Sequence, residues 1–153
     1  MQTSKGGQID IVVSILTADG ADLVGSTYVG GSQDDGFNHC EINASYGDDY
    51  RGEIMLDRER NVYIASHTSS NNFPTTPGAF DRTFNNIGTN SSTPSPAQDG
   101  VVFKLNNDLS SFFWSTYLGE DGADTAMGLR VDENNTVYVT GTCLLYTSPS
   151  PRD

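Results

Sequence analysis

The chain has 153 residues and a formal net charge of −12 at pH 7, and 35% of its residues are hydrophobic. This length fits one domain, and the acidic charge disfavours nucleic acid and anionic membrane surfaces, because both attract clustered Lys and Arg. No apolar run approaches the roughly 20 residues of a membrane-spanning helix, and none at helical spacing is long enough for an amphipathic helix. Abundant Gly, Asn, Ser, Thr and Asp favour short strands joined by turns.

Eight strand-like runs follow one another along the chain in two groups of four. The first group covers residues 9–16, 23–29, 51–56 and 62–67. The second group covers residues 101–105, 112–118, 127–131 and 137–142. Asp and Asn side chains that bond to nearby backbone amides are typical of the hairpin turns between such strands. We therefore predict that Asp57 and Asp132, at the same place in each group, stabilise turns and do not act as acids or ligands.

The two groups are copies of one sequence unit. Ser26-Thr27-Tyr28-Val29-Gly30 returns 89 positions later as Ser115-Thr116-Tyr117-Leu118-Gly119. An insertion of fourteen residues close to 37–50 then lowers the offset to 75, at which Val62-Tyr63-Ile64 returns as Val137-Tyr138-Val139. A self-similar chain stacks a unit that cannot bury its own apolar faces, and four antiparallel strands per unit are typical of propeller blades.

We therefore expect an all-β fold, a fragment of a β-propeller with two four-stranded antiparallel blades. The expected parts are a first blade at 1–70 with the insertion at 37–50, a connection at 71–98 and a second blade at 99–142. Phe73 and Phe80 are expected to anchor the connection against the blade edges. An insertion in one repeat usually maps to a loop on the binding face.

The last eleven residues, 143–153, differ in character from the repeats. Their sequence resembles an in-frame translation of a transposon-end sequencing adapter, and it interrupts the last strand after Thr142. We therefore expect a non-native tail and infer no disulfide between Cys40 and Cys143. A genuine Ser/Pro linker is the alternative.

The order and spacing of the motifs resemble a known family. The segments that carry the resemblance are 26–35, 61–66 and 73–80 in the first unit and 99–106, 115–119 and 137–141 in the second. They are similar to the seven-bladed propeller repeats of bacterial surface proteins, and the insertion resembles a variant from large proteins of gliding bacteria. Glu120 departs from the family pattern, which has glycine there. The resemblance implies a repeat protein with no defined enzymatic activity.

The same resemblance implies a secreted or cell-surface protein with roles in adhesion or gliding motility. Members of the variant are typically exported and carry a C-terminal sorting domain, and neither that domain nor a secretory signal is recognisable in the sequence. The implied partners are a protein or polysaccharide at the cell surface and the remaining blades of the parent propeller. Nucleic acid binding and membrane insertion are not expected.

Acidic pairs in the turns are the candidate metal ligands. The six candidates for calcium are Asp34, Asp35, Asp48, Asp49, Asp121 and Asp124. Calcium takes six or more oxygen ligands, whereas the sequence supplies pairs that lack EF-hand spacing. We therefore favour carboxylates that are solvated or bonded to their own backbone, with calcium as the alternative. No catalytic or cofactor-binding residue is identified.

Four other side chains have a functional alternative. His39 and Cys40 are adjacent, and adjacent residues of an extended segment point to opposite sides, which disfavours a Cys–His dyad. His67, near the end of a strand, is expected at the blade rim. Trp114 is expected to fill space between blades, with a sugar-stacking platform as the alternative.

The leading functional hypothesis is a non-catalytic scaffold that presents loops such as 37–50 to a protein or polysaccharide. One alternative is part of a carbohydrate-active propeller enzyme, a lyase or glycosidase, which needs two carboxylates across a cleft. A structural spacer in a large adhesin-like protein is another. Two blades alone expose faces and edges that a full ring covers, so we expect residues 1–142 on their own to be marginally folded or to aggregate.

Overall fold

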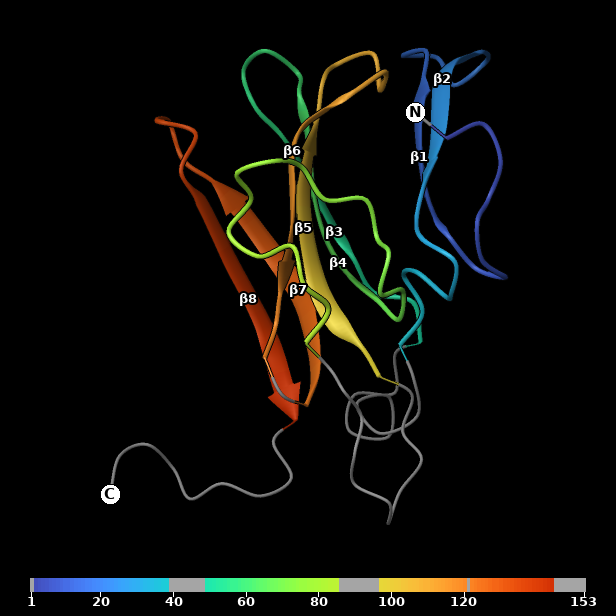
Figure 1. Cartoon of the computed structure of the whole chain (residues 1–153). Helices are drawn as coiled ribbons and strands as arrows, with labels where there is room; N and C mark the ends of the chain where they lie inside the picture. The colour runs from blue at the N-terminus through green and yellow to red at the C-terminus, as the bar shows by residue number, and fades with distance from the viewer. Residues whose placement is uncertain (1, 39–48, 86–96, 121, 145–153) are drawn as a thin grey trace.

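The computed structural model describes residues 2–38, 49–85, 97–120 and 122–144 (Figure 1). Within these residues the chain forms strands and no helix. The strands are β1 (Ile11–Leu16), β2 (Leu23–Val29), β3 (Glu53–Leu56), β4 (Val62–Thr68), β5 (Asp99–Leu105), β6 (Phe112–Leu118), β7 (Ala123–Val131) and β8 (Val137–Leu144). Every strand pair is antiparallel. The predicted all-β class is confirmed.

The strands form three sheets and not the two four-stranded blades expected from the sequence. β1 and β2 form a hairpin, β3, β4, β5 and β6 form one sheet in chain order, and β7 and β8 form a second hairpin. Figure 1 shows the four-stranded sheet between the two hairpins. β4 pairs with β5 from Val62 opposite Leu105 to Thr68 opposite Asp99. The central sheet therefore takes two strands from each sequence unit. A repeat fixes the spacing of equivalent strands along the chain, but it does not fix which strands join into one sheet.

The sequence repeat is also a repeat of structure. Val12 lies opposite Tyr28 in the first hairpin, and Val101 lies opposite Tyr117 in the β5–β6 pair, 89 positions later. Both pairs carry a register shift just before the last residue of their first strand. The β3–β4 and β7–β8 pairs correspond in the same way at an offset of 75. Each copy therefore keeps its strand register.

Two apolar layers hold the three sheets together. The layer between β1–β2 and the central sheet includes Val13, Val29, Ile64, Phe103 and Tyr117. The layer between the central sheet and β7–β8 includes Tyr63, Ala65, Val102, Ala126 and Leu129. Successive side chains of a strand point to opposite faces, so β4 and β5 supply both layers. These two strands are consequently buried along almost their whole length.

The outer edges of β6 and β2 are closed in the same way. In the connection after β4, Asp81 O accepts a hydrogen bond from Tyr117 N on β6 at 3.1 Å. Near the N-terminus, Gln2 O accepts one from Tyr28 N on β2 at 3.4 Å. Both segments thus satisfy backbone groups that an edge strand would expose.

Aromatic side chains anchor the connection, but not the expected pair. Phe73 is buried with its ring centroid 6.0 Å from that of Phe103 and 6.2 Å from that of Tyr117, as predicted. The prediction for Phe80 was wrong, because its side chain is 85% exposed. Phe84 takes the role instead and packs edge-on against Tyr117 at 5.9 Å. Two buried aromatic contacts therefore fix the segment on β6.

The turns between β3 and β4 and between β7 and β8 are built on their first Asp. Asp57 Oδ1 accepts a hydrogen bond from Asn61 N at 2.9 Å. Asp132 Oδ1 accepts one from Thr136 N at 2.8 Å. The turn-stabilising role predicted for both Asp residues is confirmed.

Candidate functional site

A cleft of about 440 Å³ lies along the edge of β1 that faces away from β2. One wall is the run 9–14, and the other includes Ile54 and Ile64 from β3 and β4. Polar side chains gather in its lining, namely Asp10, Asp35, Tyr50, Arg51, Glu53 and Ser66. A mainly apolar cleft with a few polar groups is the usual composition of a ligand site.

Asp35 has no exposed surface and is held by three donors. Its Oδ2 accepts hydrogen bonds from Gly31 N at 2.7 Å and from Ser70 Oγ at 3.1 Å, and its Oδ1 accepts one from Thr68 Oγ1. Burial raises the pKa of Asp35 to about 6 against the opposing effect of these donors, and the nearby Asp10 carboxylate adds to the rise. Asp35 thus ties the segment after β2 to the end of β4.

The Asp10 carboxyl lies close to that of Asp35, and Gly30 packs in the space between the two groups. The Asp10 carboxylate accepts hydrogen bonds from Gly6 N at 2.7 Å and Gly7 N at 3.0 Å. A Cβ at Gly30 would lie 2.5 Å from Asp35 Oδ2 and 2.9 Å from Asp10 Cγ. Such distances leave no room for a side chain, so Gly30 is required by the close approach of the two carboxyls.

The same arrangement recurs 89 positions later, at Asp99, Gly119 and Asp124. Asp99 Oδ2 accepts a hydrogen bond from Asn85 N at 2.8 Å, and Asp124 Oδ2 accepts one from Glu120 N at 3.0 Å. A Cβ at Gly119 would lie 2.8 Å from Asp124 Oδ2 and 3.0 Å from Asp99 Oδ1. The carboxyl pair is therefore a feature of the repeat. Sequence reasoning missed it, although the shared spacing of the three residues was visible.

Cys143 occupies in the second unit the place that Thr68 occupies in the first. Burial raises the pKa of the Cys143 thiol to about 12, and the neighbouring Asp124 carboxylate contributes to the rise. The thiolate is the reactive form of cysteine, so the raised pKa lowers the reactivity of this exposed thiol at neutral pH. β8 runs two residues beyond Thr142, and residues 145–153 of the expected tail lie outside the described residues.

Four of the six calcium candidates, Asp34, Asp35, Asp49 and Asp124, lie in the described residues. Asp34 Oδ1 accepts a hydrogen bond from Ile9 N at 3.2 Å, and the main-chain O of Asp49 accepts one from Asn38 N at 2.7 Å. Asp35 and Asp124 belong to different units, and Asp48 and Asp121 lie outside the described residues. In the described part of the chain, no three His, Cys, Asp or Glu side chains are grouped as a metal ion requires.

Of the four other side chains with a sequence-based prediction, His67 and Trp114 lie in the described residues. His67 is fully buried in β4 opposite Gly100. The rim position predicted for it was wrong, because β4 is an inner strand of the central sheet. Trp114 packs edge-on against Tyr63 at 6.1 Å in the layer toward β7–β8, which confirms the space-filling interpretation. His39 and Cys40 lie outside the described residues.

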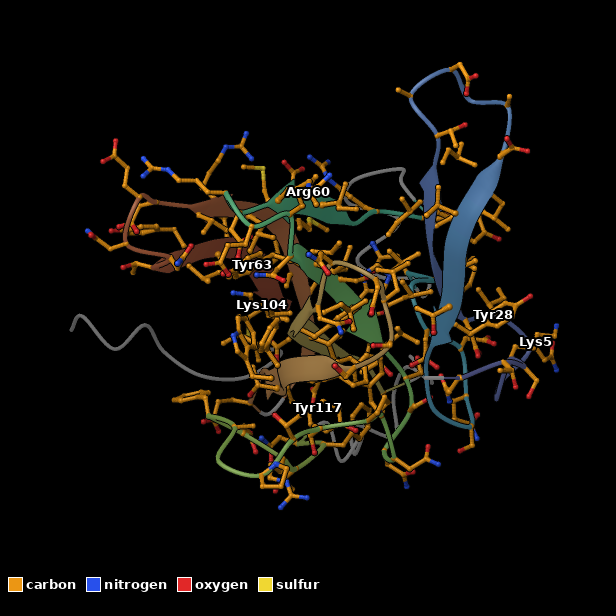
Figure 2. The ribbon with its side chains drawn as sticks, turned by 90° about the horizontal axis from the view of Figure 1, so that it is seen from above. Lys5, Tyr28, Arg60, Tyr63, Lys104 and Tyr117 are labelled. Carbon is orange, nitrogen blue, oxygen red and sulfur yellow. The ribbon has the colours of Figure 1, made fainter. Side chains whose placement is uncertain are left out.

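A buried lysine was not anticipated from the sequence. Lys104 is the next-to-last residue of β5, and its Nζ lies 3.0 Å from Asp57 Oδ2 and 4.7 Å from the ring centroid of Tyr63. Figure 2 shows Lys104 and Tyr63 next to each other. Burial opposes ionisation of Asp57, but hydrogen bonds from Asn61 and Lys104 outweigh it and lower the pKa of Asp57 to about 2. The available signal was a lysine within the apolar run of β5.

Comparisons with known proteins yield no match to a family model, a curated protein or a solved structure. Among the described residues, no helix is long and apolar enough to cross a membrane.

Proposed function

We propose that the chain is part of a β-propeller that acts as a non-catalytic scaffold and binds a protein or polysaccharide outside the cell or at its surface. The central sheet has the four antiparallel strands of one blade. β1–β2 then corresponds to the last two strands of a preceding blade, and β7–β8 to the first two of a following one. The resemblance to bacterial surface repeats supports the location.

The repetition of the carboxyl pair carries the non-catalytic part of the proposal. A general acid or nucleophile must reach its substrate, whereas Asp35 is fully buried and bonded to Gly31, Thr68 and Ser70. The equivalent pair, Asp99 and Asp124, binds backbone amides in the second unit. Groups that recur with the unit and accept bonds from its own backbone fit a structural role.

An exposed aromatic side chain at the cleft supports the binding part. The Tyr50 side chain is 65% exposed, and its ring centroid lies 5.1 Å from that of Phe37. Arg51 and Glu53 line the cleft beside it. An aromatic ring with polar neighbours can stack on a sugar ring and hydrogen-bond its hydroxyls. Tyr50 is also the last residue of the insertion at 37–50, where the sequence predicts the binding loop.

A panel of polysaccharides tests this proposal, with binding measured by affinity electrophoresis and turnover by release of reducing ends or unsaturated products. We expect binding without turnover, weakened about tenfold by Tyr50→Ala. The matched control Phe80→Ala also removes an exposed aromatic and should bind normally. Replacement of residues 39–48 by a short Gly/Ser segment tests the insertion and is expected to abolish binding.

Two outcomes would replace the proposal. Turnover that Asp35→Asn abolishes would favour a lyase or glycosidase, for which a raised pKa beside a second carboxylate is the specific observation. Absence of binding to the polysaccharides and to cell-surface proteins would leave the spacer.

A further inference from the structure

Two strands have an open edge whose repeat counterpart is paired. In the described residues β1 pairs only with β2, and β8 pairs only with β7. The counterpart of β1 is β5 and the counterpart of β8 is β4, and these two strands pair with each other over seven residues. The chain thus contains, in the β4–β5 seam, a template for joining β8 to β1.

Side chains next to the open edges are exposed where their counterparts are buried. Val12 on β1 is 57% exposed, whereas Val101 on β5 is fully buried. Ile54 on β3 is 57% exposed, whereas its counterpart Leu129 on β7 is 2% exposed. Leu16, Tyr28 and Tyr138 follow the same pattern against Leu105, Tyr117 and Tyr63. The exposed apolar surface therefore marks where neighbouring strands are absent.

The two open edges carry no device that would block pairing. Natural edge strands are commonly protected by charged side chains or proline, and neither β1 (IVVSIL) nor β8 (VYVTGTCL) contains one. The outer edges of β2 and β6 differ, because Gln2 and Asp81 accept their hydrogen bonds. In the described residues the three sheets have six edge strands, β1, β2, β3, β6, β7 and β8. Among edges that are not yet joined, β8 and β1 are the two whose repeat counterparts, β4 and β5, pair with each other.

We propose that copies of this chain associate head to tail, with β8 of one copy pairing with β1 of the next in the register of the β4–β5 seam. The seam then places Val139 opposite Ser14 and Gly141 opposite Val12 of the other copy. Strands β7, β8, β1 and β2 complete a second four-stranded sheet. This inference rests on the proposed propeller architecture.

The stoichiometry of the assembly follows from the count of sheets. Each copy contributes one complete sheet and two halves, which amounts to two blades. A head-to-tail contact that closes generates a ring, and propellers have typically four to eight blades. Two copies give four blades, three give six and four give eight, so a closed ring has one of these three sizes.

Mass measurement and disulfide trapping on the full chain test the proposal. Light scattering after size exclusion should give the mass of two, three or four copies. In a Cys40→Ser/Cys143→Ser background, Ser14→Cys with Val139→Cys should form disulfides between copies under mild oxidation. Val13→Cys with Val139→Cys is the matched control, because adjacent residues of a strand face opposite sides, and it should remain largely unlinked.

A charge on the open edge gives a second measurement. Val12→Lys replaces an exposed side chain, so the chain should fold, as judged by circular dichroism, and sediment as a monomer. A monomeric wild-type chain, or equal cross-linking by both cysteine pairs, would overturn the proposal. Polysaccharide binding by a monomeric chain would leave the proposed function intact, and register-specific rings that bind nothing would leave this inference intact.

Discussion

The pKa values of two carboxylates in this chain are shifted in opposite directions because their surroundings differ. Asp35 receives its hydrogen bonds from neutral groups, and burial prevails, raising its pKa to about 6. Asp57 is also enclosed, but Asn61 and the charged Lys104 donate to it and lower its pKa to about 2. Burial outweighs the donors at Asp35, whereas at the less buried Asp57 the hydrogen bonds from Asn61 and Lys104 outweigh burial. These two residues should therefore control stability in separate ranges of pH.

The first prediction concerns Asp35. Its folded pKa of about 6 lies above the ordinary value of 3.8, so between these values the folded state keeps a proton that the unfolded chain has released. The contribution of Asp35 to the free energy of unfolding should therefore fall by about 2 kcal/mol from pH 4 to pH 6.5. Asp35→Asn cannot titrate and should flatten this slope in urea denaturation, whereas the exposed Asp22→Asn should keep it. A wild-type chain whose stability rises over this range contradicts the assignment.

The second prediction concerns Lys104. Lys104→Met leaves the enclosed Asp57 carboxylate without its cation, and loss of one partner of a buried pair costs about 3–5 kcal/mol. Urea denaturation at pH 7 should show this loss, and the double variant with Asp57→Asn should recover part of it. Lys5→Met, at an exposed lysine, is the control. Equal stability of Lys104→Met and the control Lys5→Met would show that the ion pair contributes nothing.

At the scale of elements, the connection between β4 and β5 acts as a cover for β6. It occupies the outer edge of that strand through Asp81 and packs Phe73 and Phe84 around Tyr117. Tyr117 Oη accepts a hydrogen bond from Phe73 N at 2.9 Å and donates one to Ser70 O at 2.8 Å. A segment without regular structure is thus held by a few buried contacts, and its side chains differ sharply in importance.

The third prediction compares two phenylalanines of this segment. Phe73→Ala removes a buried ring and should lower the free energy of unfolding by about 3–5 kcal/mol. Phe80→Ala removes an exposed ring of the same size and should change it by less than about 0.5 kcal/mol. Thermal or urea denaturation of the two variants side by side measures the difference. Comparable losses would mean that Phe80 is buried in solution.

At the scale of the whole molecule, the sequence predicts the repeating strands but not which of them join into one sheet. The eight strands, the repeat and the turn roles of Asp57 and Asp132 follow from local patterns of apolar and turn residues. The join between β4 and β5 does not, because about thirty residues separate these strands and any permutation of a repeat has the same period. Sequence could suggest anchoring by aromatics, but whether Phe80 or Phe84 is buried depends on the path of the connection.

The candidate site shows the same division. The carboxyl pairs at Gly30 and Gly119 could be predicted from their common offset once the repeat is known. The burial of Asp35, the cleft beside β1 and the contact of Lys104 with Asp57 depend on which strands pair and on how the sheets stack. Such contacts lie far apart in the sequence and leave no local pattern.

The fourth prediction concerns the effect of salt on the proposed assembly. Each copy carries a net charge of −12, so copies repel one another, and salt screens this repulsion over about 10 Å at 0.1 M. The seam itself is uncharged and should persist at high salt. Sedimentation should therefore show association at lower protein concentration in about 0.5 M NaCl than in about 0.02 M. Dissociation by salt would indicate a contact held by ion pairs.

The half-unit shift between sequence repeat and sheet has a consequence for how such proteins lengthen. When a gene segment that encodes one sequence unit is duplicated, each junction between units falls inside a four-stranded sheet and not between two sheets. Each new unit is then joined to its neighbour by main-chain hydrogen bonds between two paired strands, like those between β4 and β5. Because such a ladder tolerates most side chains, duplicated modules can diverge in sequence without coming apart.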